Sequence, residues 1–285
     1  MKIKRVSLLP LLILMIAAMV GSGFAQTSLV EGKLSSKLMG REMPYRVITP
    51  TDYASSKEKR YPVIYLLHGL TGHYSNWSDT TPLAKYAVGF NAIIVMPEGD
   101  NGWYTDSVSK ANDKYESYIV KELIPEIDGK YRTIADRKNR AIAGLSMGGY
   151  GGLKFGLKYP EMFSLAGSFS GALSAASFTE KTAGVIGKGI DEIYGPTDGE
   201  VRKSNDVFEI VRNASPEKIK TFPFLYVDCG TEDFLIGNNR DFSALLLEKK
   251  IPHEFRQLPG GHTWPYWDKQ VQEFLRIAER SFSAK

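Results

Sequence analysis

One serine stands among glycines at the end of an apolar run, where Gly144, Ser146 and Gly148 form a G-x-S-x-G pattern. The apolar run at residues 139–144 predicts a buried strand, and the residues after Ser146 suit the start of a helix. A sharp turn between strand and helix leaves room only for small flanking residues, and it exposes the serine hydroxyl above the sheet. Ser146 is therefore a candidate nucleophile for acyl transfer. The alternative is a glycine-rich turn in which the serine has no role.

A serine hydroxyl needs a base, and in an α/β-hydrolase sheet the acid and then the histidine follow the serine along the chain. Two histidines follow Ser146. His253 falls inside the run at residues 253–258, which predicts a strand, so we expect it to belong to the sheet. His262 comes directly after a glycine pair in the loop that follows this run. We predict that His262 is the base.

The acid that orients this histidine should lie in the loop after the preceding strand. The apolar run at residues 222–227 predicts that strand, and three carboxylates follow it: Asp228, Glu232 and Asp233. Asp228 is still within the strand, and the longer Glu232 could face solvent. Asp233 has the reach to hold the second ring nitrogen of His262. We prefer Asp233 by analogy with the loop position of such acids, and the other two carboxylates remain alternatives.

Acyl transfer also needs hydrogen-bond donors for the negative oxygen that forms on the substrate. The backbone N–H of Met147, directly after the serine, is the first predicted donor. The loop after the apolar run at residues 61–67 should supply the second, and we predict the N–H of Leu70. His68, in the same loop, is expected to brace the loop, and we assign it no proton chemistry.

Aromatic residues occur in two of the loops expected near Ser146. Trp103 and Tyr104 follow the predicted strand at residues 91–96, and Trp264 comes just after the predicted base. Such rings could stack on a sugar or on a phenolic acyl group, so we predict all three as substrate-binding residues. The alternative is that they pack the bases of the loops.

Apolar runs that alternate with amphipathic helical stretches predict the fold. Residues 30–48 suit an antiparallel hairpin at the edge of the sheet, and the remaining runs alternate with helices expected at residues 115–127, 241–250 and 270–282. This alternation is typical of a mostly parallel, doubly wound α/β sheet. Residues 172–221 lack a clear strand. We expect them to form an insertion or cap over one end of the sheet, partly helical near residues 189–194.

The amino terminus predicts export. Lys2, Lys4 and Arg5 precede an apolar run of 13 residues, which is too short to span a bilayer, and small residues follow as far as Ala25. This order of segments is typical of a signal peptide at residues 1–25. The protein is therefore expected to be secreted or periplasmic, with no membrane attachment after cleavage.

The composition of residues 26–285 suits one catalytic domain of α/β type. Without the signal segment, 33 Lys and Arg face 32 Asp and Glu, so charge gives no reason to expect a nucleic-acid partner. Cys229 is the single cysteine, so an internal disulfide or a thiolate metal cluster is excluded. His68 and His73 alone do not make a metal site. We predict no metal and no cofactor, and the sequence leaves the oligomeric state open.

Five motifs in order resemble the esterase D family of α/β-hydrolases, which includes tributyrin, feruloyl and acetylxylan esterases, S-formylglutathione hydrolases and mycolyltransferases. The resemblance runs over nearly the whole chain after the signal segment. It implies an α/β-hydrolase fold with Ser146 as nucleophile, Asp233 as acid, His262 as base, and the amides of Leu70 and Met147 as oxyanion donors. The motifs are Y-L-L-H-G-L at 65–70, M-P-E-G-D-N-G-W-Y-T-D at 96–106, G-L-S-M-G-G at 144–149, C-G-T-E-D at 229–233 and G-G-H at 260–262.

The expected activity is hydrolysis of short-chain, acetyl or feruloyl esters. Export favours small-molecule or polysaccharide esters outside the cytoplasm, such as those that decorate plant polysaccharide. A thioesterase of the S-formylglutathione type and an acyltransferase remain alternatives, since they would use the same residues. An inactive homologue that only binds carbohydrate is an alternative from a different class, although a binding protein has no need of nucleophile, acid, base and donor loop together.

Overall fold

The computed structural model describes residues 27–283, and the predicted signal peptide lies outside the described residues. Eight strands form one sheet in the order β1-β2-β4-β3-β5-β6-β7-β8. The strands are β1 (Ser28–Ser36), β2 (Arg41–Thr49), β3 (Val63–Leu67), β4 (Ile93–Pro97), β5 (Arg140–Leu145), β6 (Leu165–Phe169), β7 (Phe224–Gly230) and β8 (His253–Leu258).

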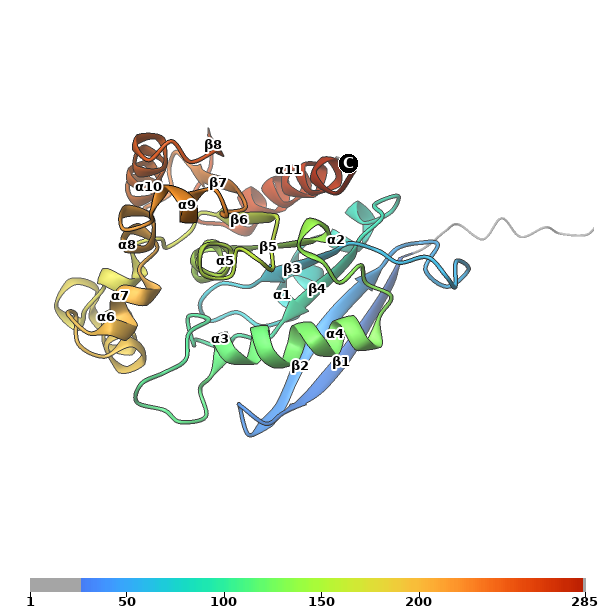
Figure 1. Ribbon diagram of the computed structural model, residues 1–285, viewed down its shortest axis with the longest axis horizontal. Coiled ribbons are helices and arrows are strands. Elements are labelled where there is room, and N and C mark those ends of the chain that lie inside the picture. The colour runs from blue at the N-terminus through green and yellow to red at the C-terminus, as the bar shows by residue number, and fades with distance from the viewer. Residues whose placement is uncertain (1–26, 284–285) are drawn as a thin grey trace, which may run out of the picture.

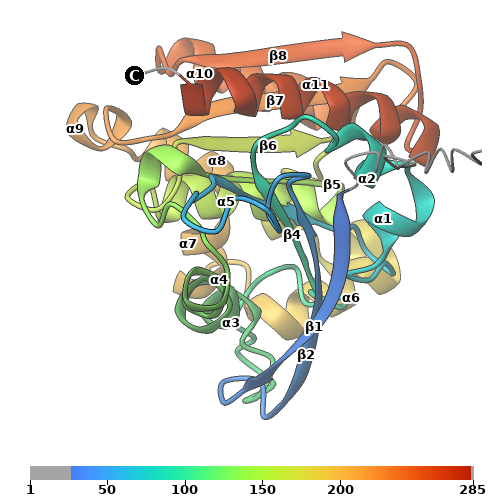
Figure 2. The same ribbon diagram turned by 90° about the vertical axis from the view of Figure 1, so that its right-hand side faces the viewer.

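The pairing of the strands is mixed but mostly parallel. β1 and β2 form an antiparallel hairpin, β2 also pairs antiparallel with β4, and all strands from β4 to β8 pair in parallel. The hairpin lies at one edge of the sheet and extends beyond its neighbours (Figure 2). The predicted fold class, a doubly wound sheet with an edge hairpin, is confirmed.

Helices cover the sheet between the strands. A π-helical turn (Ile119–Leu123) joins α3 and α4 into one continuous helical stretch. The α-helices are α1 (Asn76–Thr80), α2 (Leu83–Tyr86), α3 (Tyr115–Tyr118), α4 (Ile124–Lys130), α5 (Met147–Lys158), α6 (Glu180–Tyr194), α7 (Glu200–Asn205), α8 (Val207–Arg212), α9 (Pro216–Ile219), α10 (Ile236–Glu248) and α11 (Trp264–Ser283).

Burial of both faces of the sheet explains why the central strands are almost wholly apolar. Alternate residues of β3 enter different cores: Tyr65 and Leu67 belong to one cluster, and Ile64 and Leu66 to the other. Helices α3, α4, α5, α8 and α10 supply side chains to the first cluster, and α1, α2 and α11 to the second. Figure 1 shows α11 on the opposite side of the sheet from α3 and α4.

Two predicted helices begin earlier in the structure than the sequence pattern indicates. α11 starts at Trp264, six residues before the predicted start, because Pro265 fits the first helical turn, where its missing N–H breaks no helical hydrogen bond. α10 starts at Ile236, and the glycine and asparagines of its first turn hide this start in the sequence. Asn239 is fully buried and donates to the carbonyl oxygen of Gly171 (2.9 Å), so tertiary contact stabilises this turn.

The predicted insertion at residues 172–221 contains α6, α7, α8 and α9, so it is more helical than the expectation for residues 189–194 alone. Hydrogen bonds attach it to α5. Tyr194 donates its hydroxyl hydrogen to the Tyr150 hydroxyl (2.8 Å), which donates in turn to the carbonyl oxygen of Asn205 (2.7 Å). In residues 27–283, no helix combines the length and the apolar composition needed to cross a membrane.

Candidate active site

Ser146 lies at the turn between β5 and α5 with φ 55° and ψ −115°, a backbone conformation that non-glycine residues rarely adopt. The neighbouring glycines make this turn possible. A Cβ atom on Gly144 would lie 2.6 Å from backbone atoms of Gly148, and one on Gly148 would lie 2.5 Å from the carbonyl oxygen of His68. The structure therefore agrees with the prediction that this turn leaves room only for small flanking residues, since larger ones would collide with the backbone.

His262 lies between Ser146 and Asp233, on the loop from β8 to α11. Its Nε2 is 2.9 Å from the Ser146 Oγ, and its Nδ1 is 2.9 Å from the Asp233 Oδ2. A carboxylate oxygen only accepts hydrogen bonds, so Nδ1 carries a hydrogen and a neutral imidazole leaves Nε2 free to accept from the serine hydroxyl. The structure therefore brings the three predicted residues into one hydrogen-bonded chain.

The geometry distinguishes the three candidate acids. Only Asp233 contacts His262; Glu232 instead accepts from the backbone N–H of Gly260 and from the Thr231 hydroxyl. Burial raises the pKa of Asp233, but the hydrogen bonds from His262 and from the N–H of Leu235 (2.8 Å) outweigh it, so its pKa lies below the usual range. Asp233 is therefore ionised beside the histidine.

The two predicted oxyanion donors come from two different loops of the site. Met147 is the first residue of α5, and Leu70 follows β3 in the loop that lines the same cavity as Ser146. Within residues 27–283, neither the Leu70 N–H nor the Met147 N–H donates to a backbone carbonyl. Both groups are thus available to a substrate oxygen.

A cavity of about 630 Å³ opens at this point. Its walls come from the loops after β3, β5 and β8 and from the first turns of α1 and α11, and no residue of the insertion at residues 172–221 lines it. The predicted substrate contact Trp264 is in the wall. The lining residues are Gly69, Leu70, Thr71, Gly72, Asn76, Leu145, Ser146, His262, Thr263, Trp264, Pro265 and Trp267.

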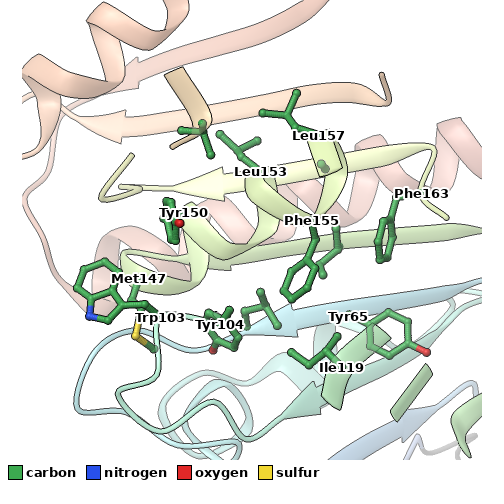
Figure 3. Close-up of a cluster of buried hydrophobic side chains, with 14 of the residues drawn as sticks. Tyr65, Trp103, Tyr104, Ile119, Met147, Tyr150, Leu153, Phe155, Leu157 and Phe163 are labelled. Carbon is green, nitrogen blue, oxygen red and sulfur yellow. The ribbon is translucent and has the colours of Figure 1, made fainter. Parts of the chain in front are cut away.

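Trp103 and Tyr104 do not line this cavity. Tyr104 is fully buried and donates its hydroxyl hydrogen to the carbonyl oxygen of His68 (2.9 Å), so its prediction as a substrate contact is wrong. Trp103 is 4% exposed, and its ring packs edge-on against Tyr150 at 6.0 Å. Figure 3 shows both rings in the buried cluster with Met147. Both residues therefore belong to the core. This agrees with the alternative prediction, in which they pack the bases of the loops.

A protein-family model described as "Putative esterase" matches residues 36–277. The chain belongs to this esterase family. A curated acetyl esterase of Caldicellulosiruptor saccharolyticus is 28% identical over 251 residues, which cover 83% of this chain and 92% of the relative. An esterase of Mycobacterium tuberculosis is 31% identical over 257 residues, covering 81% of this chain and 55% of that relative.

Solved structures agree with this assignment. A ferulic acid esterase superposes with a TM-score of 0.79 at 30% identity, covering 91% of this chain and all of that chain (100%). The fluorophosphonate-binding serine hydrolase F of Staphylococcus aureus gives a TM-score of 0.80 at 26% identity, covering 89% and 99%. The α/β-hydrolase fold and the resemblance to this family are confirmed, and the protein is a carboxylic ester hydrolase of the serine-hydrolase type.

Two aromatic residues of this esterase contact His262 and were not predicted from the sequence. The Phe234 ring lies 4.7 Å from the imidazole and is 77% exposed, and the Trp267 ring stands edge-on to it at 4.9 Å. Phe234 directly follows the proposed acid, a position that could have identified it. Trp267 lies on the first turns of α11, which the sequence pattern placed in a loop.

Three side chains with metal-binding atoms lie together near the oxyanion loop of the esterase. His73, Glu98 and Asp100 each bring one such atom within 4.8 Å of the others. Asp100 already pairs with Arg41 (2.8 Å), whose positive charge opposes a cation there. The backbone N–H groups of Tyr74, Gly99 and Asp100 donate to Glu98. We assign the two carboxylates to interactions within the protein.

Asp228, the rejected candidate acid, is a buried carboxyl group in the sheet. It is fully buried on β7, and neither of its side-chain oxygens has a hydrogen-bond partner in the described residues. Burial raises its pKa well above the usual range, and the nearby hydroxyl groups of Tyr226 and Tyr266 oppose this shift without cancelling it. A buried carboxylate without a salt-bridge partner is strongly unfavourable, so the neutral form is the one that suits this site.

We expect Asp228→Asn to stabilise the esterase, and more so at higher pH. Because the folded-state pKa of Asp228 is raised, its contribution to stability is complete below the unfolded-state pKa and is lost as the pH rises through the folded-state pKa. The loss is about 1.4 kcal/mol for each pH unit between these two values. Asparagine is neutral throughout.

Urea unfolding of wild type and variant at pH 4.5 and pH 8 measures this effect. The free energy of unfolding of Asp228→Asn should exceed that of wild type by a wider margin at pH 8. A margin that is equal at both pH values, or wider at pH 4.5, would show that Asp228 folds in its ionised form.

Proposed function

We propose that this protein is an exported serine esterase that hydrolyses short-chain, acetyl or feruloyl esters of plant polysaccharide through an acyl-serine intermediate. The observation that carries the proposal is the hydrogen-bonded chain from Ser146 through His262 to Asp233, with 2.9 Å at each link, at the wall of an open cavity. Each residue has the partner that its proposed role needs.

In the proposed mechanism, Ser146 attacks the ester carbonyl while His262 Nε2 takes the hydroxyl proton. The negative oxygen of the tetrahedral intermediate accepts from the Leu70 and Met147 N–H groups. His262 then gives its proton to the leaving alcohol, and a water molecule cleaves the acyl-serine with His262 again as base. Asp233 orients the imidazole and stabilises its positive form.

The substrate part of the proposal is supported by relatives and by the cavity. One curated relative, 28% identical, is an acetyl esterase, and a ferulic acid esterase of solved structure is 30% identical with a shared fold. Trp264 in the cavity wall and the exposed Phe234 ring beside His262 offer apolar faces on which an aromatic acyl group could stack. The cavity is open, which suits an ester attached to a polymer.

The export part rests on the amino-terminal pattern of basic, apolar and small residues up to Ala25. In the proposal, cleavage leaves residues 26–285 as one catalytic domain, with residues 172–221 as its insertion. Expression of the full chain followed by amino-terminal sequencing of the exported protein tests this. Full-length protein that is retained in the cytoplasm would contradict export.

The substrate class is tested by comparing kcat/KM on acetylated xylan, methyl ferulate, tributyrin and S-formylglutathione. We expect one of the first two substrates to exceed the thioester by at least about 10-fold, a difference of about 1.4 kcal/mol in transition-state binding. A preference for the thioester would overturn the polysaccharide assignment. Formation of an acyl-sugar in place of the free acid would identify a transferase, and no turnover of any ester would favour the carbohydrate-binding alternative.

A further inference from the structure

A second histidine and a second carboxylate lie together behind the oxyanion loop. His68 is 1% exposed and Glu98 is 5% exposed. The Nε2 of His68 lies 3.1 Å from Glu98 Oε1, and its Nδ1 lies 2.8 Å from the carbonyl oxygen of Gly69. Neither His68 nor Glu98 lines the cavity at Ser146, so any effect on the reaction passes through the loop.

The bond from His68 ends on the peptide unit that carries a proposed oxyanion donor. The carbonyl of Gly69 and the N–H of Leu70 belong to one planar peptide group, so fixing the carbonyl also fixes the direction of the N–H. The carbonyl oxygen only accepts, and therefore His68 donates from Nδ1. Because linked hydrogen bonds polarise one another, this bond also makes the Leu70 N–H a stronger donor.

Glu98 and the backbone N–H of Gly99 both lie at the other side of the imidazole, next to Nε2. Burial raises the pKa of Glu98, but hydrogen bonding and charge interaction with His68 and two backbone N–H groups lower it to about 2. One of these N–H groups, that of Asp100, lies 2.7 Å from Oε1. The Gly99 N–H donates to Nε2 of His68 and to Oε1 of Glu98, 2.9 Å from each, so in the neutral ring Nε2 accepts and Nδ1 carries the hydrogen that points at Gly69.

The rest of the loop is held without His68. The Thr71 N–H donates to the Asn101 side chain (2.7 Å), and the Gly72 N–H donates to the carbonyl oxygen of Gly69 (3.0 Å). Loss of the His68 bond would therefore leave the loop in place, and the Gly69 carbonyl oxygen would keep only one of its two donors, the Gly72 N–H. This predicts an effect on catalysis that is separable from an effect on folding.

We propose that Glu98 and His68 are positioning residues that orient and polarise the Leu70 N–H for the transition state of ester cleavage. The inference rests on the proposed function, because it requires the oxyanion to form at Leu70. Removal of one oxyanion donor typically lowers the rate about 100- to 1000-fold, so a donor that is misdirected but present should lower it about 10- to 100-fold.

Four variants test this proposal. Asparagine places its amide nitrogen near the position of Nδ1, whereas glutamine places it near Nε2. We expect His68→Gln to lower kcat about 10- to 100-fold with KM unchanged, and His68→Asn to retain kcat within about 5-fold. Glu98→Gln should lower kcat about 3- to 10-fold. His73→Asn is the matched control, because exposed His73 also contacts Glu98, at 3.3 Å, but not Gly69; its kcat should not change.

A boronic acid inhibitor supplies a readout that a purely structural role would not move. Its tetrahedral adduct on serine presents an oxygen to the oxyanion donors, so its inhibition constant should rise in His68→Gln by the same factor as kcat/KM falls. Thermal unfolding checks that each variant is folded. If His68→Gln does not fold, kcat and the inhibition constant are compared in His68→Asn and Glu98→Gln instead, and these two variants decide whether the positioning role holds.

The outcomes separate this inference from the proposed function. Wild-type kcat and inhibitor affinity in His68→Gln, or an equal loss in His68→Asn and His68→Gln, would overturn the positioning role. So would a loss above about 100-fold in folded His68→Asn, since this variant keeps the donor. An active Ser146→Ala would overturn the proposed function itself, whereas an inactive one with fully active His68→Gln would overturn only the inference.

Discussion

We expect Ser146→Ala to lower the turnover of p-nitrophenyl acetate by about 10⁵- to 10⁶-fold, the scale of effect when the serine of a hydrogen-bonded triad is removed. The reason is that the covalent intermediate forms on Oγ, the atom that lies 2.9 Å from His262 Nε2. Residual activity should come only from the oxyanion donors and from substrate binding.

The same variant should keep its fold. The backbone at Ser146 is anchored by its N–H, which donates to the carbonyl oxygen of Phe169 (2.9 Å), and this bond does not involve the side chain. The temperature of unfolding and a fluorophosphonate label check the variant: wild type should be labelled, and Ser146→Ala should not. Ser177→Ala, on an exposed turn, is the control for labelling and activity. Turnover within about 10-fold of wild type would place the nucleophile elsewhere.

The sequence predicts the sheet well because burial on both faces selects continuous apolar runs. β8 is found at the predicted residues 253–258, and β5 is displaced by only one residue from 139–144. The order of the strands follows from rules of connection for parallel sheets and not from any single residue. The sequence therefore predicts which segments are strands better than where each one ends.

Helix starts were predicted less well, because local propensity and tertiary contact disagree there. The first turn of α10 contains Gly237 and Asn239, which are poor helix formers, and the contact of Asn239 with Gly171 that stabilises this turn is not visible in the sequence. The insertion at residues 172–221 was underestimated for a similar reason. Three of its helices have six residues or fewer, and α6 is interrupted by a kink at Ala183 and Gly184, so their periodicity is weak.

The proposed site depends on the sequence in two different ways. The serine is marked by local constraints, since Gly144 and Gly148 are needed by the backbone itself. The choice among the acids is not local, because it depends on which loop reaches His262 across 29 residues of chain. Aromatic residues are the weakest case: Tyr104 and Trp264 look alike in sequence, and only the three-dimensional structure shows that one is buried and the other lines the cavity.

We expect Asp233→Asn to lower kcat by about 10⁴-fold at neutral pH through the wrong tautomer of His262. The Leu235 N–H donates to Oδ1 of Asp233 (2.8 Å), so the asparagine carbonyl oxygen should take that position and its NH₂ group should face His262. Facing a donor, Nδ1 must accept, and the ring hydrogen moves to Nε2. Nε2 then has no lone pair for the Ser146 proton.

Asp228→Asn is the matched control, because the same chemical change is made five residues earlier on a fully buried side chain that does not contact His262. Its kcat should stay within about 3-fold of wild type, while Asp233→Asn loses activity and remains folded. The two variants should differ because a carboxylate is needed at position 233, beside His262, and is unfavourable at position 228, where it is buried. If both variants lost activity equally, the effect would lie in the packing of β7 and its loop, and the orientation of His262 by Asp233 would not account for catalysis.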